Sequence, residues 1–442
     1  MRTPAASWVM SILAAIMTSP LGCASQRSGT GPASTQPGGP TTTRPTMPAP
    51  SAKAVYEAVI KAADGIEANL PEISRLADKA AEWYVQDGIG IRAAGDPVFC
   101  SELVGRSGGM IALEGPQTPA SPTWKGIVLY APRRHTLGDD MIAIRAYRAQ
   151  GCRVIVFCPK ALLAIKKYPL EYDDFVETHG RNGAMFDVRG RKVISVDDIA
   201  AITTGWTFTA EFVSACTRRG KMPAMHASWV FHGKERWEKL GATRKFHDEA
   251  PKAAIPALQL GKIYLAELRK AMTVVGTQGP QVGQVASMAI AARDAHKGVY
   301  ALIEGHAMIF EAESLMDAGV FTRLGYWQTP RADVTISPGD MIFGVGYAGM
   351  FEEWGKYIPD SRTKGAKLAW TFAGYKAGST TPSTPAGEPL IDQGFLWGDA
   401  VVPVEGYDVP ILPVSGVTQV TVYQMVCAEV LAQRPEHGEP KK

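Results

Sequence analysis

The sequence has almost no excess of charge of either sign. Its 46 lysines and arginines are nearly balanced by 43 aspartates and glutamates, which gives a formal net charge of +3. Proteins that bind nucleic acid through its phosphates generally gather positive charge on one face. The composition therefore provides no basis for a nucleic-acid partner.

Cysteine is scarce, and no pair of cysteines has CxxC spacing. Apart from Cys23, the cysteines are Cys100, Cys152, Cys158, Cys216 and Cys427, each beside apolar neighbours. We interpret these as buried free thiols; a Cys152–Cys158 disulfide is the alternative in an exported chain.

The signature of a helical zinc site is also missing. His226 and His232 lie six residues apart, which is not the i,i+4 pair of such a site, and no cysteine or acid completes the set. We predict no metal site.

The apolar run near the N-terminus, Trp8 to Met17, is too short to span a bilayer. With Arg2 ahead of it, the run is typical of an export signal. The following Ser-Pro-Leu-Gly-Cys23 resembles a bacterial lipobox, although Pro20 stands where an aliphatic residue is usual. We therefore expect residues 1–23 to be a signal peptide and Cys23 to carry a lipid that anchors an exported protein to the membrane. Secretion with cleavage nearby, or a cytosolic chain, are the alternatives.

Residues 24–53 contain almost no large apolar side chain and are rich in Pro, Thr, Ser and Gly. Such a segment cannot bury enough surface to offset chain entropy, so we expect a disordered linker. The remainder, about 380 residues, exceeds what one hydrophobic core usually serves. We predict a domain over 54–250, a second over 251–435, and a tail at 436–442.

An internal repeat organises these two domains. Long stretches with helical spacing of apolar residues (55–86 and 258–295) each lead into an apolar strand (88–95 and 298–305), and further strands are expected at 126–132 and 152–158 and at 340–346 and 366–372. Continuous apolar strands that alternate with helices indicate parallel sheets covered on both faces. The offset of about 210 residues indicates two copies of one unit. The predicted fold class is α/β, with two αβα sandwich domains of flavodoxin-like topology.

The stretch from Gly95 to Gly109 contains Glu102-Leu103, then Arg106, then Gly108-Gly109. It resembles the strand, glycine-rich turn and E-L-x-x-R-x-G-G helix of the sugar isomerase (SIS) family of phosphosugar-binding domains, here in tandem. The resemblance covers most of residues 55–434. It implies a sugar or phosphosugar ligand in a pocket at the carboxyl ends of the strands. We expect the glycine pair to close a helix that runs from 97 to 106.

Aldose-ketose isomerisation requires a carboxylate base and an acid that polarises the sugar. The resemblance points to Glu102, His306 and Glu313 for these roles, with Glu311 close by. The alternatives are structural: Glu102 as a surface carboxylate paired with Arg106 at i,i+4, and His306 as a capping or packing residue.

The loops of the first half depart from the family pattern. Asp96 ahead of Pro97 predicts an N-cap and a proline at the first helical position, and a carboxylate there would repel phosphate. Gly95 and Asp96 remain candidates for contact with sugar hydroxyls. In the second loop, guanidinium groups replace the usual hydroxyls; these can grip an anion in bidentate fashion, or form a solvated basic turn. The candidate ligand residues of this loop are Arg133, Arg134 and Thr136.

In the second half the candidate ligand residues are Gly305, Gly346, Tyr347, Gly349 and Ser415, with helix capping as the alternative for Ser415. Residues 344–349 have the sequence G-x-G-x-x-G, which makes a dinucleotide-binding site an alternative to consider. Such a site needs an acid about 20 residues on, at the end of the next strand. After the end of the strand expected at 366–372, the first acid is Glu388. We predict no cofactor.

These observations favour a sugar- or phosphosugar-binding protein whose activity is open. A (phospho)sugar isomerase is one alternative, and a noncatalytic structural or interaction protein is another. The expected partner is a small-molecule sugar, and a homodimer is left open beside a monomer.

Overall fold

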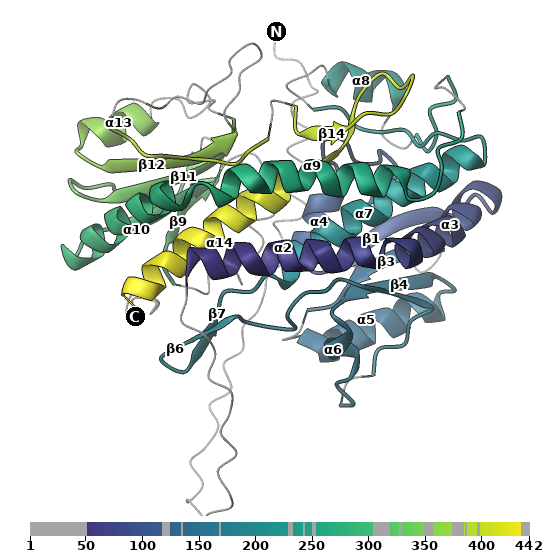
Figure 1. Ribbon diagram of the computed structural model, residues 1–442, viewed down its shortest axis with the longest axis horizontal. Coiled ribbons are helices and arrows are strands. Elements are labelled where there is room, and N and C mark those ends of the chain that lie inside the picture. The colour runs from purple at the N-terminus through teal and green to yellow at the C-terminus, as the bar shows by residue number, and fades with distance from the viewer. Residues whose placement is uncertain are drawn as a thin grey trace, which may run out of the picture. The chain divides into compact units, whose positions relative to one another are not determined.

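The computed structural model describes residues 51–116, 124–133, 136–167, 169–228, 233–241, 244–249, 253–303, 319–326, 329–348, 357–373, 384, 387–395 and 398–434. Contacts among these residues join them into one compact unit. Figure 1 shows its helices and strands.

The first half contains a parallel sheet. Its strands are β1 (Gly90–Gly95), β2 (Leu113–Glu114), β3 (Gly126–Ala131), β4 (Arg153–Cys158) and β5 (Asp174–Glu177). They lie in the order β2-β1-β3-β4-β5, and every neighbouring pair is parallel. Every residue of β3 is buried, as expected for a strand covered on both faces.

The second half contains a sheet with the same order of strands. It comprises β8 (Val299–Ile303), β9 (Thr322–Tyr326), β11 (Met341–Ala348), β12 (Lys367–Ala373) and β13 (Leu390–Asp392), with the short β10 (Thr329–Pro330) added antiparallel at one edge. The parallel strands lie in the order β9-β8-β11-β12-β13. The predicted α/β class with parallel sheets is confirmed, and the order is the flavodoxin-like one in both halves.

Each long helical stretch expected from the sequence is a pair of helices. The pairs are α2 (Ala52–Ala68) with α3 (Leu70–Gln86), and α9 (Gln259–Gly276) with α10 (Gly279–Asp294). The second member of each pair carries a proline in its first turn, Pro71 and Pro280. A proline lacks the N–H that would continue the preceding helix but suits the start of a new one, which explains both breaks.

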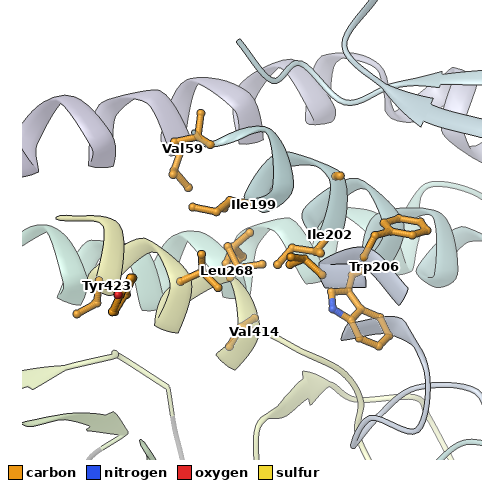
Figure 2. Close-up of a cluster of buried hydrophobic side chains, with 14 of the residues drawn as sticks. Val59, Ile199, Ile202, Trp206, Leu268, Val414 and Tyr423 are labelled. Atoms are coloured by element: carbon orange, nitrogen blue, oxygen red, sulfur yellow. The ribbon is translucent and has the colours of Figure 1, made fainter. Parts of the chain in front are cut away.

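The first member of each pair covers the opposite half. Helix α2 packs against α14 (Ser415–Gln433), whereas α9 packs against α7 (Asp197–Arg218). Figure 2 shows the apolar centre that results, where Val59 of α2, Ile202 of α7, Leu268 of α9 and Tyr423 of α14 lie close together. All four are buried. The two halves therefore share a hydrophobic core.

The outer faces of the sheets are covered separately. In the first half, α5 (Leu137–Ala149) and α6 (Lys160–Leu163) bury an apolar cluster that includes Val128 and Ile144. In the second, α13 (Tyr357–Thr363) buries a cluster that includes Ile342 and Trp370. Each sheet thus has helices on both faces, as predicted.

The remaining described elements are β6 (Phe186–Val188), β7 (Arg191–Val193), α8 (Gly233–Leu240), β14 (Ala400–Val402) and β15 (Ile411–Pro413). Among the helices that the structure describes, none combines the length and the apolar character needed to cross a membrane. The cysteines at 100, 152, 158, 216 and 427 are buried and free, which confirms the interpretation as thiols.

Candidate functional site

Helix α4 (Pro97–Leu103) places Glu102 between the two halves. The side chain of Glu102 is fully buried, so its reading as a surface carboxylate is wrong. Its Oε2 lies 3.1 Å from Nε of Arg106, and its Oε1 accepts a hydrogen bond of 3.1 Å from the Trp206 indole of α7. Burial raises the pKa of Glu102 to about 7, against the attraction of the Arg106 guanidinium.

The α4 helix ends at Leu103, with Val104 as its C-cap, so the expected helix to 106 closed by a glycine pair is wrong. Gly108 instead bonds to other segments: its N–H donates to the His226 carbonyl, and its carbonyl accepts from the Leu412 N–H. Its φ of +73° explains the glycine.

Arg106 links α4 to the start of α14. Its guanidinium donates to Ser415 Oγ at 2.9 Å and lies 3.6 Å from Asp399 Oδ2. Asp399 Oδ1 in turn accepts from the Ser415 N–H at 3.0 Å. Ser415 is the first residue of α14, and the N-cap position before it is held by Val414, so the capping alternative is wrong. Its hydroxyl belongs to the joint between the halves.

Gly416 lies directly on this joint. A Cβ at this position would be 2.1 Å from Glu102 Oε1, so glycine is required for α14 to approach α4. The Glu102, Arg106, Asp399, Ser415 and Gly416 set is called the interhalf joint below.

The carboxyl edge of the second sheet lies next to the interhalf joint. The Gly346 carbonyl of β11 accepts hydrogen bonds from two buried side chains, Nε2 of Gln393 at 3.0 Å and Nε2 of Gln419 at 2.8 Å. Gln393 also donates to Thr371 Oγ1 at 3.2 Å. Ser415 and Gln419 are four residues apart on α14 and share one face of it, which connects this edge to the joint.

The side-chain amide oxygens of Gln393 and Gln419 are hydrogen-bond acceptors without a donor among the described residues. A carbonyl can only accept, so both amides must turn Nε2 toward Gly346, which fixes the position of Oε1. Both Oε1 atoms are buried and have no hydrogen-bond partner among the described residues. An unpaired buried acceptor costs stability unless a ligand or water donates to it.

The strand expected at 340–346 is confirmed as β11, which continues to Ala348 and so contains Gly344, Gly346 and Tyr347. The Tyr347 hydroxyl accepts from the Gly398 N–H at 3.1 Å, which ties the strand end to the residue that precedes Asp399.

At the carboxyl ends of β1 and β3, the first sheet is closed by its own residues. The Asp96 N–H donates to the Ala131 carbonyl at 2.7 Å, across the gap between β1 and β3. The Asp96 carboxylate accepts from the N–H groups of Val98 and Phe99, which confirms the predicted N-cap, and Pro97 is the first residue of α4. Gly95, with φ +93°, could not hold a Cβ because it would be 2.2 Å from the Ala131 oxygen.

Other carboxylates gather at this edge. Asp140 of α5 accepts from the Tyr130 hydroxyl (2.8 Å), the Arg133 N–H (2.9 Å) and the Thr136 hydroxyl (3.2 Å). Burial and the neighbouring Asp96 and Asp197 carboxylates raise the pKa of Asp198 well above its usual range. The positive charge of Arg133 lowers the pKa of both Asp96 and Asp198 and so opposes this shift. Arg133 therefore interacts with carboxylates of the protein itself.

The structure brings Glu102 and Ser415 together across the halves, and Gly346 and Tyr347 lie beside them. Gly95, Asp96, Arg133 and Thr136 lie at the other sheet edge. The candidates Arg134, Gly305, His306, Glu313, Gly349 and Cys23 lie outside the described residues. The sequence analysis did not identify Asp399, Gln393 or Gln419. Only Gln419 could have been found from the sequence, because it lies one helical turn after the candidate Ser415.

The fold and these contacts define a class: a two-half α/β protein in which a polar joint between the halves adjoins the carboxyl edge of one parallel sheet. No protein-family model matches the sequence, and no curated protein matches it.

Solved structures do match over most of their length. The chain is similar to the C-terminal domain of glucosamine-fructose-6-phosphate aminotransferase from Francisella tularensis, with TM-score 0.49, 12% identity, and coverage of 86% of this chain and 94% of that one. It is also similar to a candidate phosphosugar isomerase from Silicibacter pomeroyi DSS-3, with TM-score 0.44, 10% identity and coverage of 87% and 98%. A third is a candidate sugar binding protein from Salmonella typhimurium LT2, with TM-score 0.45, 12% identity and coverage of 86% and 98%.

Proposed function

We propose that this protein binds a sugar at the carboxyl edge of its second sheet, between Gly346 and the interhalf joint. The observation that carries the proposal is the pair of buried amide oxygens of Gln393 and Gln419, which have no partner among the described residues. Ligands of open α/β sheets bind at this edge, where the strand order reverses between β8 and β11.

The chemistry of these acceptors favours hydroxyl groups as partners. A sugar hydroxyl can donate to Oε1, whereas an ionised phosphate offers only acceptors. We therefore infer that the sugar ring, rather than a phosphate, contacts Gln393 and Gln419. Any phosphate would have to be held elsewhere on the ligand.

The test is a thermal-shift and calorimetric screen of the protein with neutral sugars, amino sugars and sugar phosphates, repeated with Gln419→Leu. Gly346 keeps its bond from Gln393 in this variant, so we expect little loss of stability and a loss of binding of about tenfold or more. The control is Gln424→Leu, which removes another buried amide on α14. Five residues along a helix correspond to a rotation of about 140° from Gln419, so Gln424 points elsewhere.

Equal binding by wild type and Gln419→Leu would reject this site. Failure of every sugar to stabilise the wild-type protein would reject the function and favour an interaction protein.

A (phospho)sugar isomerase is the second candidate, and one observation favours it. Glu102 has a pKa raised to about 7, and a base titrating near neutral pH suits proton transfer. The test is exchange of the proton on the second carbon of a bound sugar with deuterium from solvent, followed by NMR. Binding without exchange would reject the isomerase and leave the binding function.

Export is part of the proposal. The apolar run before Cys23 and its lipobox-like context support attachment of a lipid to that thiol. Mass spectrometry of protein from a membrane fraction should show a lipid on Cys23, and Cys23→Ser should move the protein to the soluble fraction. An unmodified Cys23 in protein of full length would reject anchoring.

A further inference from the structure

A groove with a volume of about 670 Å³ opens at the carboxyl ends of β4 and β5, apart from the site described above. Its wall includes Asn69, Lys160, Phe175, His179 and Arg181. Small-molecule sites typically have volumes of roughly 300–1,000 Å³. The groove is therefore large enough to hold a metabolite-sized ligand.

The cations of the groove are available to a ligand. Lys160 and Arg181 are exposed, and neither has an ion-pair partner among the described residues. Glu177 also lines the groove, but its carboxylate is engaged by backbone groups, because its oxygens accept from the N–H groups of Lys160 at 2.7 Å and His179 at 2.9 Å. Asp197 likewise accepts from the Asn182 N–H at 3.0 Å.

His179 supplies a second and independent observation. Its Nε2 is buried and has no hydrogen-bond partner among the described residues, although the residue lines the groove. Its ring is held tightly against α2, where a Cβ on Gly65 would be 2.5 Å from its Cγ. His179 and Asn182 both have φ of +57°, an unfavourable conformation for residues other than glycine.

The described residues at the corresponding place in the second half pack more closely. There the Asp392 N–H donates to Oε1 of Gln278, which lies at the break between α9 and α10. Gly394, with φ +75°, approaches α9 so closely that a Cβ would be 2.3 Å from the Ala271 oxygen. The segment from Thr178 to Gly183 thus keeps an opening that its counterpart fills.

We propose that this groove binds a small molecule bearing an oxyanion, with Arg181 and Lys160 on the carboxylate or phosphate and His179 Nε2 bonded to the same ligand. Arginine recognises both groups through paired N–H donors. This second site is independent of the proposed sugar site.

The experiment titrates the protein with glucuronate, inorganic phosphate and glucose, followed by calorimetry and by the NMR signals of the His179 ring. The variants are Lys160→Ala/Arg181→Ala and, as a matched control, Lys192→Ala, an exposed lysine of β7. Both cations are exposed, so the double variant should fold normally.

We expect glucuronate or phosphate to bind wild type and Lys192→Ala, and the double variant to bind about tenfold or more weakly. Whichever anion binds identifies the oxyanion. Equal affinity of the double variant, a glucose effect as large as that of the anions, or no anion binding at millimolar concentration would overturn the proposal. The Gln419→Leu variant should bind the anion normally, which separates this test from that of the sugar site.

Discussion

The carboxyl edges of the two parallel sheets occupy the same place in the same strand order, but they are chemically different. The first carries Asp96, Asp140 and Asp198 with Arg133 among them, and the carboxylates of Asp96 and Asp140 are bonded to hydroxyl and N–H groups of the chain. The second presents the neutral amides of Gln393 and Gln419, each with an unpaired oxygen.

At the ends of β1 and β3 the first edge has its polar groups bonded within the chain, whereas the second edge is the one proposed to bind a sugar. At the first edge Asp96 fills the helix N-terminus where an anion would otherwise bind, so the protein supplies the anion itself. At the second edge, the Oε1 atoms of Gln393 and Gln419 have no hydrogen-bond donor among the described residues. The interhalf joint connects the two edges, because Glu102 comes from the first half and Ser415 from the second.

The largest effect is expected at the joint, from Glu102→Gln. Burial raises the pKa of Glu102 from 4.5 to about 7, so the folded protein retains a proton that the unfolded chain loses as pH rises between these values. Titration of this carboxyl therefore leaves the free energy of unfolding unchanged below pH 4.5. Between pH 4.5 and about 7 it lowers the free energy of unfolding progressively, by about 3 kcal/mol at the upper end. Urea unfolding at acidic and neutral pH should show a flatter pH dependence in the variant.

The control for that measurement is Glu57→Gln, which changes an exposed glutamate of α2. A pH dependence of unfolding in Glu102→Gln that is the same as in wild type would show that this carboxyl does not titrate in the way its burial implies.

Gly416→Ala should push α14 of the second half away from Glu102 of the first half. The new Cβ would be 2.1 Å from Glu102 Oε1, and Glu102 cannot retreat easily because Arg106 and Trp206 hold it. We expect a loss of about 2 kcal/mol in unfolding free energy. The matched control is Gly283→Ala in α10, where a Cβ has open space and alanine should stabilise the helix by about 0.5–1 kcal/mol. Equal changes in the two variants would mean that α14 is not packed on Glu102.

At the first edge, Asp198→Asn should stabilise the protein at neutral pH by about 1 kcal/mol, because it removes a partly buried carboxylate and its repulsion from Asp96. The gain should shrink as pH falls, since the raised pKa leaves Asp198 protonated there. The control is Asp139→Asn, which changes an exposed carboxylate in the first turn of α5. Destabilisation by Asp198→Asn at neutral pH would show that the charge of Asp198 is needed at this edge.

Local patterns in the sequence predicted the parallel sheets and the Asp96 cap, since each depends on neighbours in the chain. Apolar runs identify buried strands, and an aspartate before a proline identifies a helix start. The burial of Glu102 could not be predicted in this way. It depends on Gly416, more than three hundred residues away, and on the exchange of α2 and α9 between the halves, which no local pattern encodes.

The same reason explains the missed amides. Gln393 follows β13 and Gln419 lies inside α14, and only the fold brings both to the Gly346 carbonyl. The break at Asn69, by contrast, had a local signal in Pro71, yet the apolar spacing continued through it and concealed the break.

The smallest effect is expected from a pair of threonines, one at each edge. Thr136→Val removes one of the hydrogen bonds to Asp140, which keeps those from Tyr130 and Arg133, so the loss should be about 0.5 kcal/mol. Thr371→Val removes an acceptor for Gln393, which keeps its bond to Gly346, so the loss of stability should be similar. The two variants should differ in sugar binding, because only Thr371→Val removes one of the two hydrogen bonds that hold the Gln393 amide, whose oxygen a sugar hydroxyl would meet. If calorimetry shows sugar binding weakened by Thr136→Val and unchanged by Thr371→Val, the binding edge is the first one and the assignment of the two edges must be reversed.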